Sequence, residues 1–413
     1  MRVIYYHQHF STPHGSGGTR SYELAQHLVA GGHDVTMVCG SYDVSSTGLD
    51  SPFVRGRRAG MVDGIRVIEY QLPYSNADSF LARSWSFLRF AARSTWLAMT
   101  ERYDLVFATS TPLTAGIPGI VARWLRRKPF VFEVRDLWPE LPREMGVIRN
   151  PLVLGAMGVL EWVSYRSAHA CIGLSPGIVA GIERRLGKPK PVYMIPNGCD
   201  LDLFAPRAVA DDVIPGVGAR DFVAIFTGAH GMANGLDAVL DAAAELKARD
   251  DTRRIKLVFV GKGKCKPDLV RRAKEEDLSH CLFLDPVPKT ELVGYLQRAD
   301  VGLMILDDVP AFYFGTSPNK FFDYLASGLP VLTNYPGWLC ELIGEHQCGV
   351  AVPPGDASAF ADALQQLSAE PETLTAMGRR GRQLGGTSFA RQALGERFAR
   401  AIEATIDAHR GAA

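Results

Sequence analysis

The feature that most constrains this chain is a regular alternation of short apolar segments with longer segments of helical periodicity. The apolar segments are rich in valine, isoleucine and phenylalanine at consecutive positions. Strands of this kind are buried on both faces, which is typical of parallel sheets covered by helices. We expect them at residues 3–6, 34–39, 65–70, 105–108, 130–134, 170–174, 192–195, 222–227, 256–260, 282–284, 301–305, 330–333 and 349–352. The pattern predicts an α/β protein with doubly wound, Rossmann-like parallel sheets.

The chain is long enough for two domains of this type. Its 413 residues compare with ~100–200 residues for one domain. A turn-rich connection over residues 196–216 separates the two sets of strands. We therefore predict a first domain at residues 1–200 and a second at residues 201–387. A last helix at 388–410, separated from the second domain by Gly385-Gly386, is expected to pack back on the first domain.

The charge is distributed unevenly along the chain. The net charge is +1, but the 45 Lys and Arg and 44 Asp and Glu leave an excess of basic residues in the first half and of acidic residues in the second. A basic half favours an anionic contact, either a nucleic acid or the surface of a membrane, although chance variation would also produce it. No basic helix with base-reading side chains stands out, so we expect no nucleic acid.

Cysteine usage and hydropathy suggest where the protein works. The seven cysteines are scattered without a Cys-x-x-Cys pair, so we expect neither a disulfide framework nor a zinc site, and a reducing cytosol. The first residues enter a strand at once, so we expect no signal peptide. No apolar run reaches the ~20 residues of a transmembrane helix. We expect a cytoplasmic protein.

The most specific motif lies at residues 317–331, which read SPNKFFDYLASGLPV. Ser317 and Asn319 stand at the expected start of a helix, where free backbone N–H groups and the helix dipole favour an anion. Lys320 would neutralise a diphosphate there. Asp323, one turn later, would accept hydrogen bonds from sugar hydroxyls. The motif therefore predicts a binding site for a nucleoside diphosphate.

Two glycine-bearing loops follow the first strand of each half. The first carries Gly17, Gly18 and Arg20, and the second runs from Gly228 to Asn234. Both lie at the carboxyl edge of a sheet, where ligands bind in this architecture, and glycines allow a phosphate or sugar to approach the backbone closely. Their spacing fits neither the dinucleotide fingerprint nor the P-loop. A flexible loop without a ligand is the alternative.

Other candidate residues follow neighbouring strands at the same edges. Arg135 and Asp136 follow the strand at 130–134. Asp136 would position or partly deprotonate an acceptor hydroxyl, or it caps the next turn. Lys262 follows the strand at 256–260 as a rim cation or as a solvated loop charge, and main chain near Val287 would read a base edge.

Together these motifs resemble a retaining glycosyltransferase of the GT-B fold and of family 4, most closely the fucosamine-transferase-like enzymes of O-antigen, capsule and exopolysaccharide assembly. The resemblance covers residues 7–20, 135–139, 195–198, 228–235, 317–331 and 341–343. It implies two domains that face each other across a cleft and a nucleotide-sugar donor, with a UDP-sugar favoured. It also implies metal-independent transfer, without a cofactor, to a polyprenyl-diphosphate-linked or glycan acceptor at the inner face of the cytoplasmic membrane.

The resemblance also implies roles for individual residues. Asp323 corresponds to the ribose ligand, Gly17 and Gly18 to the contact with donor phosphate and acceptor, and Val287 to the main-chain contact with the base. The resemblance implies catalytic roles for Gly18, Asp136 and Lys320. Further donor-side residues are Gly228, Asn234, Lys262, Ser317 and Asn319, and the acceptor side has Arg20, Arg135 and Asp136.

The sequence departs from the family pattern in the second half. Gly315 stands where many members carry a first carboxylate, and Ala229 and Asn234 stand where many carry Arg and Lys. Lys320, with Lys262 or Arg20, would then have to supply the positive charge. These departures keep two alternatives open, a GT-B-like subunit without catalysis and another α/β enzyme such as a sugar-nucleotide epimerase or an oxidoreductase.

Residues 81–99 form a helix that combines arginines with an apolar stripe. The stripe contains Leu81, Trp85, Leu88, Ala92, Trp96 and Met99. Arginine and tryptophan beside an apolar stripe suit a helix on an anionic lipid surface. The alternative is an ordinary surface helix that buries this stripe in the first domain.

Overall fold

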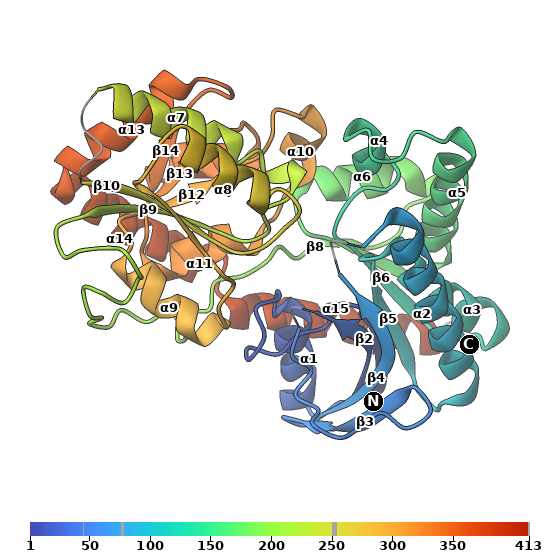
Figure 1. Cartoon of the computed structure of the whole chain (residues 1–413). Coiled ribbons are helices and arrows are strands. Elements are labelled where there is room, and N and C mark those ends of the chain that lie inside the picture. Colours follow the sequence, from blue (N-terminus) through green and yellow to red (C-terminus); the bar gives the residue numbers. More distant parts are fainter. Residues whose placement is uncertain (44, 76–77, 250–253, 412–413) are drawn as a thin grey trace. The chain divides into compact units, whose positions relative to one another are not determined.

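The computed structural model describes residues 1–43, 45–75, 78–249 and 254–411, which form two α/β units (Figure 1). The first unit comprises Met1–Pro196, Phe314–Ser317 and Gln392–Ala413. The second comprises Asn197–Tyr313 and Pro318–Arg391.

The first unit contains an 8-stranded sheet in the order β3-β4-β2-β1-β5-β6-β7-β8. Its strands are β1 (Arg2–Tyr6), β2 (Asp34–Tyr42), β3 (Arg57–Val62), β4 (Ile65–Tyr74), β5 (Leu105–Thr109), β6 (Phe130–Val134), β7 (Ala170–Gly173) and β8 (Val192–Met194). Neighbouring strands run parallel, with Val3 beside Val35 on one side and Leu105 on the other. The exception is β3, which pairs antiparallel with β4.

Helices cover both faces of the first sheet. They are α1 (Arg20–Ala30), α2 (Phe80–Thr100), η1 (Leu113–Gly116), α3 (Ile117–Leu125), α4 (Glu140–Glu144), α5 (Pro151–Ser167), α6 (Pro176–Leu186) and α15 (Arg391–Gly411). One core cluster joins the sheet to Phe90 of α2 and Tyr165 of α5. The other joins it to Leu28 of α1 and Phe398 of α15, whose ring lies 4.9 Å from that of Phe107. The last helix therefore packs on the first sheet.

The second unit contains a 6-stranded parallel sheet in the order β11-β10-β9-β12-β13-β14. Its strands are β9 (Phe222–Thr227), β10 (Ile255–Val260), β11 (Cys281–Leu284), β12 (Val301–Met304), β13 (Val331–Thr333) and β14 (Gly349–Ala351). The remaining helices are η2 (Met232–Asn234), α7 (Asp237–Ala248), α8 (Lys266–Glu275), α9 (Lys289–Arg298), α10 (Pro310–Gly315), α11 (Asn319–Ser327), α12 (Trp338–Glu345), α13 (Ala357–Ala369) and α14 (Pro371–Ser388).

In both sheets the winding direction changes beside the first strand of the unit. β1 lies between β2 and β5, and β9 lies between β10 and β12. Loops that leave the carboxyl ends of strands at such a switch point diverge and leave room for a ligand. The fold therefore favours the loops after β1 and β5 in the first unit and after β9 and β12 in the second.

The predicted fold class of two doubly wound parallel sheets is confirmed, but two local predictions were wrong. Strand β3 was missed, because its sequence RRAGMV is polar at its start and mostly accessible, and it pairs through a tight turn in which Asp63 and Gly64 have positive φ. Gly385-Gly386 does not separate two helices but lies inside α14. A Cβ on Gly385 would lie only 2.9 Å from Cys199 Sγ, so the glycine permits close helix packing.

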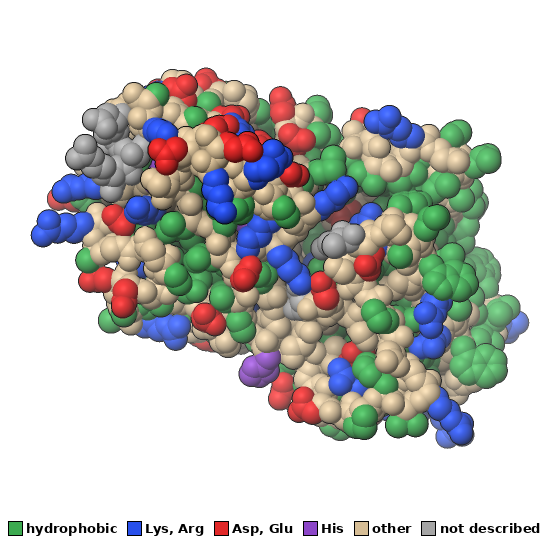
Figure 2. Space-filling model, viewed as in Figure 1, with side chains coloured by type: hydrophobic (Ala, Val, Ile, Leu, Met, Phe, Trp, Pro, Cys, Tyr) green, Lys and Arg blue, Asp and Glu red, His purple; other side chains and the backbone are tan. Residues whose placement is uncertain are grey.

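The structure also decides between the two alternatives for the apolar stripe on α2. The helix buries Ser86, Phe90, Ala91, Ser94, Leu97 and Ala98, while every member of the predicted stripe is exposed. The alternative that the stripe is buried in the first domain is therefore wrong. Figure 2 shows hydrophobic side chains along the right-hand margin of the molecule, over α2, α3 and α5. Among the described residues, no helix combines the length and hydropathy needed to span a bilayer.

Candidate functional site

Helix α11 begins at the carboxyl edge of the second sheet. Pro318, in an extended conformation, precedes its first residue, and Gly328 ends the helix with a left-handed φ of 68°. Tyr324 anchors the helix because its hydroxyl accepts a hydrogen bond from Thr227 N at 3.1 Å and donates one to Ile225 O at 3.2 Å. The first turn of α11 is therefore fixed beside the end of β9, at the switch point.

Lys320 in this first turn lies over the end of β9. Its Nζ lies 3.5 Å from the centroid of the Phe226 ring, and a Cβ placed on Gly228 would lie 3.3 Å from the same Nζ. Burial lowers the pKa of Lys320 to about 7. Burial disfavours the charged ammonium form, and a nearby anion favours it. Lys320 is therefore well suited to bind a phosphate at this loop.

Asp323, one turn further along α11, is paired with a lysine that sequence reasoning missed. Lys289 Nζ lies 2.9 Å from Asp323 Oδ1, and both side chains are largely buried. Lys289 is the first residue of α9, directly after the segment 285–288 that was expected to meet a base. The pairing holds the carboxylate in place near the start of α11.

The loop after β9 closes on itself and on the loop after β12. Gly228 has a φ of 137° and Gly235 a φ of 49°, and a Cβ on Gly235 would lie 2.7 Å from Asp307 Cα. Asn234 Nδ2 donates to Ala229 O at 2.8 Å. The Asn234 amide group therefore organises the loop, and its expected contact with the donor stays a prediction.

One residue of this loop is a buried histidine. His230 is fully buried, and burial, with lysines nearby, lowers its pKa to about 4, so it is neutral. Its ring lies among those of Phe226, Phe259 and Phe283. Within the described part of the chain, neither ring nitrogen has a hydrogen-bond partner. The glycine loop thus rests on an apolar, uncharged support.

Lysine 266 braces the two neighbouring strand ends. Its Nζ donates to Gly261 O at 2.9 Å, Leu284 O at 2.8 Å and Asp285 Oδ1 at 2.8 Å. These bonds fix the loops that carry Lys262, which is exposed, and Val287, which is half-buried. Lys262 therefore follows β10, the neighbour of β9, and Val287 follows β11, the edge strand beyond β10.

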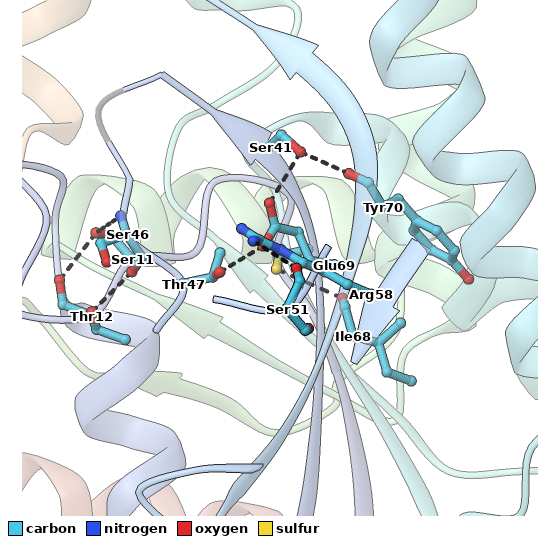
Figure 3. A network of polar contacts seen from close by, with 11 residues as sticks. Ser11, Thr12, Ser41, Ser46, Thr47, Ser51, Arg58, Ile68, Glu69 and Tyr70 are labelled. Atoms are coloured by element: carbon cyan, nitrogen blue, oxygen red, sulfur yellow. Dashed lines mark hydrogen bonds and ion pairs between the residues drawn. The ribbon is translucent and has the colours of Figure 1, made fainter. Parts of the chain in front are cut away.

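The glycine-rich loop of the first unit is held by a network of hydroxyl groups (Figure 3). Thr12 N donates to Ser46 O at 2.8 Å, and Ser46 N donates to Ser11 Oγ at 3.3 Å. A Cβ on Gly15 would lie 2.3 Å from Ser11 Oγ, and one on Gly17 would lie 3.3 Å from Ser11 Cβ. Glycine is needed at position 15 because the loop packs tightly on its own hydroxyls.

The same network continues to Glu69 on β4 (Figure 3). This buried carboxylate accepts hydrogen bonds from Thr47 Oγ1 at 2.6 Å, Arg58 Nε at 2.9 Å and Ser41 Oγ at 3.1 Å. The loop after β1 is thereby connected to the sheet through residues 45–47. Gly17 and Gly18 lie on the accessible side of this braced loop.

Arg20 does not supply the free cation that we predicted. Its guanidinium group is buried and donates to Glu133 Oε1 at 3.0 and 2.8 Å, to Pro196 O at 2.6 Å and to Ile195 O at 2.7 Å. Thr109 Oγ1 donates to the other oxygen of Glu133 at 2.8 Å. Arg20 is therefore a structural link between α1, β6 and the segment after β8, because each of its three side-chain nitrogens donates to a protein acceptor.

The carboxyl end of β6 brings Arg135 and Asp136 beside two neutral histidines. Burial raises the pKa of Asp136, while the charge of Arg135 opposes this effect. Burial and the charge of Arg135 lower the pKa of His7 and lower that of His9 to about 3. The His9 ring also contacts Tyr74 at 4.5 Å between centroids. This edge thus combines a carboxyl group, neutral imidazoles and an aromatic wall.

Ser317 and Gly315 lie in the short segment Phe314–Ser317 that belongs to the first unit. Ser175 Oγ at the start of α6 donates to Gly315 O at 3.2 Å, and a Cβ on Gly315 would lie 3.3 Å from Ile178 Cγ1. Asn319, Lys320 and Asp323 belong to the second unit. The motif at 317–331 therefore divides between the two units just before α11.

The described residues do not suggest a metal centre. No group of three or more His, Cys, Asp or Glu side chains among them is arranged to hold an ion. The sequence does contain one Asp-x-Asp spacing, Asp200-Leu201-Asp202. Asp200 accepts a hydrogen bond from Leu203 N at 3.1 Å and lies 3.9 Å from Arg391, so it caps a turn.

Two family profiles match this chain. Residues 15–198 match the family described as "Glycosyl transferase 4-like domain". Residues 221–370 match the family described as "Glycosyl transferases group 1". The first match includes Gly17, Gly18 and the strands of the first sheet after β1, and the second includes the whole second sheet, its glycine loop and the start of α11.

Curated relatives match part of the chain. A D-inositol 3-phosphate glycosyltransferase of Corynebacterium aurimucosum is 29% identical over 214 residues, which is 48% of this chain and 48% of the relative. The enzyme of the same name from Nocardia farcinica is 31% identical over 215 residues, or 49% of this chain and 46% of the relative. The matched stretch therefore spans about half the length of the curated relatives.

Solved structures match the fold over nearly the whole chain. Sucrose-phosphate synthase of Thermosynechococcus elongatus has a TM-score of 0.76 at 19% identity, covering 98% of this chain and 99% of that chain. Anabaena HepE in complex with UDP-glucose has a TM-score of 0.70 at 16% identity, covering 98% of this chain and 100% of that chain. WaaG, a glycosyltransferase involved in lipopolysaccharide biosynthesis, has a TM-score of 0.69 at 15% identity, covering 96% and 98%.

Proposed function

Since the chain is built from two glycosyltransferase-family domains in the GT-B fold, we propose that it transfers a sugar from a nucleotide-diphosphate donor. The donor diphosphate binds at the start of α11. The observation that carries this proposal is the position of Lys320 over Phe226 and against Gly228, at the switch point of the second sheet. Burial lowers the pKa of this lysine, so a bound anion would stabilise its charged form.

The groups at this edge suit the departure of a diphosphate. In the transfer, the bond between the anomeric carbon and the diphosphate oxygen breaks, and a bond from that carbon to the acceptor oxygen forms. Lys320 and the free N–H groups of α11 stabilise the negative charge that develops on the leaving oxygen. Asp323 accepts hydrogen bonds from the ribose hydroxyls. We further propose that no metal takes part.

We propose that the anomeric configuration is retained. The acceptor oxygen attacks from the face that the diphosphate leaves, and the departing phosphate oxygen takes the acceptor proton. Asp136, whose pKa is raised by burial, orients the acceptor hydroxyl, and Gly17 and Gly18 approach donor phosphate and acceptor through their backbone. This assignment follows the family resemblance of these loops.

A UDP-sugar is the favoured donor. Support comes from the neighbours, since HepE is solved with UDP and with UDP-glucose and a trehalose-6-phosphate protein of E. coli is solved with UDP-2-fluoro glucose. Val287 and the segment 285–288, next to the Lys289–Asp323 pair, are the proposed contact to the base.

The proposed acceptor is a polyprenyl-linked or glycan intermediate of bacterial surface polysaccharide synthesis, as in the fucosamine-transferase-like subgroup. The lipopolysaccharide role in the name of WaaG supports this acceptor. The names of the inositol 3-phosphate relatives point to a phosphorylated polyol as the competing acceptor class. We propose a cytoplasmic protein that is peripheral to the membrane.

A second candidate function is that of a GT-B-like subunit without catalysis. The observation that favours it is the use of Arg20 and Asn234 inside the protein, which leaves fewer groups for the diphosphate. An enzyme and a binding subunit would both take up a nucleotide, so binding alone does not separate them.

Isothermal titration with UDP, GDP and ADP tests donor binding, followed by incubation with UDP-sugars and the two acceptor classes. We expect UDP to bind more tightly than GDP and ADP, and NMR of the product to show the donor's anomeric configuration. Inverted product would contradict retention. Nucleotide binding without transfer or donor hydrolysis would favour the subunit, and no binding of any nucleotide would contradict the proposal.

A further inference from the structure

The first unit carries an apolar surface that its own packing leaves uncovered. It consists of the outward sides of α2, α3 and α5, which lie over one face of the first sheet (Figures 1 and 2). Trp96 is 72% exposed, Trp124 64% and Leu152 82%, and Trp85, Val159 and Trp162 are also exposed. We name this surface the tryptophan face. Large contiguous apolar surfaces on soluble domains mark contacts with another body.

The charged residues of the tryptophan face have one sign. The sequences of α2 and α3 contain no Asp or Glu, and α5 contains one, Glu161. Glu161 is buried, so its carboxylate does not reach the surface. Arg89 of α2 and Arg166 of α5, by contrast, are exposed, and so is Arg127, two residues after the end of α3. Any body that covers this face therefore meets apolar groups and positive charge together.

Two of the tryptophans are paired with guanidinium groups. Arg123 Cζ lies 5.5 Å from the Trp124 ring centroid, and Arg166 Cζ lies 4.5 Å from that of Trp162. Tryptophan prefers the boundary between headgroups and hydrocarbon, and arginine beside it can reach lipid phosphates. Each pair keeps a cation beside an exposed indole ring, as an interfacial contact needs.

We infer that the tryptophan face binds the surface of an anionic phospholipid bilayer. A second copy of this chain fits less well, because a two-fold contact would place the same arginines against each other without surface carboxylates. An anionic bilayer supplies phosphates above an apolar interior, which matches the face in both respects. The 21 residues of α2 extend ~30 Å and would lie flat on the membrane.

This inference names the surface for the peripheral membrane contact proposed above, and it does not depend on the proposed glycosyl transfer. The face belongs entirely to the first unit, whereas Lys320 and Asp323 belong to the second. Membrane binding and nucleotide binding can therefore succeed or fail separately.

Flotation with vesicles tests the inference on the whole chain. We expect binding to vesicles of phosphatidylglycerol mixed with phosphatidylcholine, weak binding to phosphatidylcholine alone, and a loss of binding as salt rises. The variant Trp85→Gln/Trp96→Gln/Trp124→Gln should lose most of the bound fraction. Arg89→Gln/Arg127→Gln should weaken binding by roughly fivefold per charge removed.

Matched controls come from exposed residues elsewhere. Val54→Gln on the first unit and Arg207→Gln on the second replace exposed side chains and should bind vesicles like the parent. Titration with UDP reports on each variant's second unit. Equal flotation of the tryptophan variant and the parent would overturn the inference. So would absence of parent binding, or a dimer in sedimentation that the tryptophan variant dissolves.

Discussion

Lys289 Nζ lies 2.9 Å from Asp323 Oδ1, and only a tenth of each side chain is accessible. Lys289 is the first residue of α9, and Asp323 lies in the second turn of α11. The ion pair therefore joins the two helices that border the proposed nucleotide site. A buried pair of this kind costs most when one partner is removed, because the other charge stays buried without compensation.

The first prediction is that Lys289→Met destabilises the protein by about 3–5 kcal/mol. The double variant Lys289→Met/Asp323→Leu should recover much of this loss, since it removes both charges. Urea denaturation followed by far-UV circular dichroism measures the free energies of unfolding. A double variant as unstable as the sum of the single variants would contradict a coupled pair.

Asp323→Asn should weaken UDP binding by tenfold or more on the scale of about 1.5–3 kcal/mol for a hydrogen bond to a charged group. The amide has the shape of the carboxylate but lacks its charge. Isothermal titration measures the dissociation constant, and Asp202→Asn, at an exposed position of the same unit, serves as the control. Unchanged affinity in Asp323→Asn would remove the ribose assignment.

The pKa of Lys320 makes nucleotide binding depend on pH. Burial lowers this pKa to about 7, and a bound diphosphate favours the charged form, so its binding raises the pKa. Above pH 7 the complex must take up a proton, and affinity should fall as pH rises. Titrations at pH 8 in buffers of different ionisation enthalpy measure this uptake, which Lys320→Met should abolish and Lys264→Met should not.

The pKa of Lys320 should also make the stability of the free protein depend on pH, but in the opposite direction: stability should rise with pH, whereas nucleotide affinity falls. The folded pKa of Lys320 lies below its ordinary value of 10.5, so between pH 7 and pH 10.5 the unfolded chain binds more protons than the folded one. The contribution of Lys320 to the free energy of unfolding therefore rises with pH. Lys320→Met should stabilise the free protein most near and below pH 7, and a constant difference up to pH 10 would contradict this.

Arg20→Met should act on stability and leave UDP affinity unchanged. The substitution leaves Glu133 buried without its cation and costs about 3–5 kcal/mol, whereas Lys320 and Asp323, the side chains proposed to hold the nucleotide, belong to the other unit. Arg102→Met, at an exposed position of the first unit, should change neither quantity. A variant that is stable but loses UDP binding would restore Arg20 as a ligand residue.

The apolar strands could be predicted from the sequence because burial on both faces leaves a local pattern. Residues that contact each other but are far apart in the sequence leave no such local pattern. Arg20 and Glu133 are separated by 113 residues, and the sequence around Arg20 contains no pattern that would predict its buried acceptor. Lys289 was missed for the same reason, since only the packing of α9 against α11 brings it to Asp323.

Helix α2 shows a different limit. Its periodicity contains two apolar stripes, one through Trp85 and Trp96 and one through Phe90 and Leu97. The sequence shows that both exist, but only the packing of the first sheet determines which is covered. The structure buries Phe90 and Leu97, so the more aromatic stripe is the accessible one.

The height of α11 above the second sheet is set by a residue without a side chain. A Cβ on Gly302 of β12 would lie 2.4 Å from Tyr324 Cδ2, and Tyr324 is the residue that seats the helix on β9. The positions of Lys320 and Asp323 therefore both depend on the packing of Tyr324 against Gly302. A methyl group at position 302 would move both together, so the size of donor that this edge accommodates can be adjusted from beneath, without altering any group that touches it.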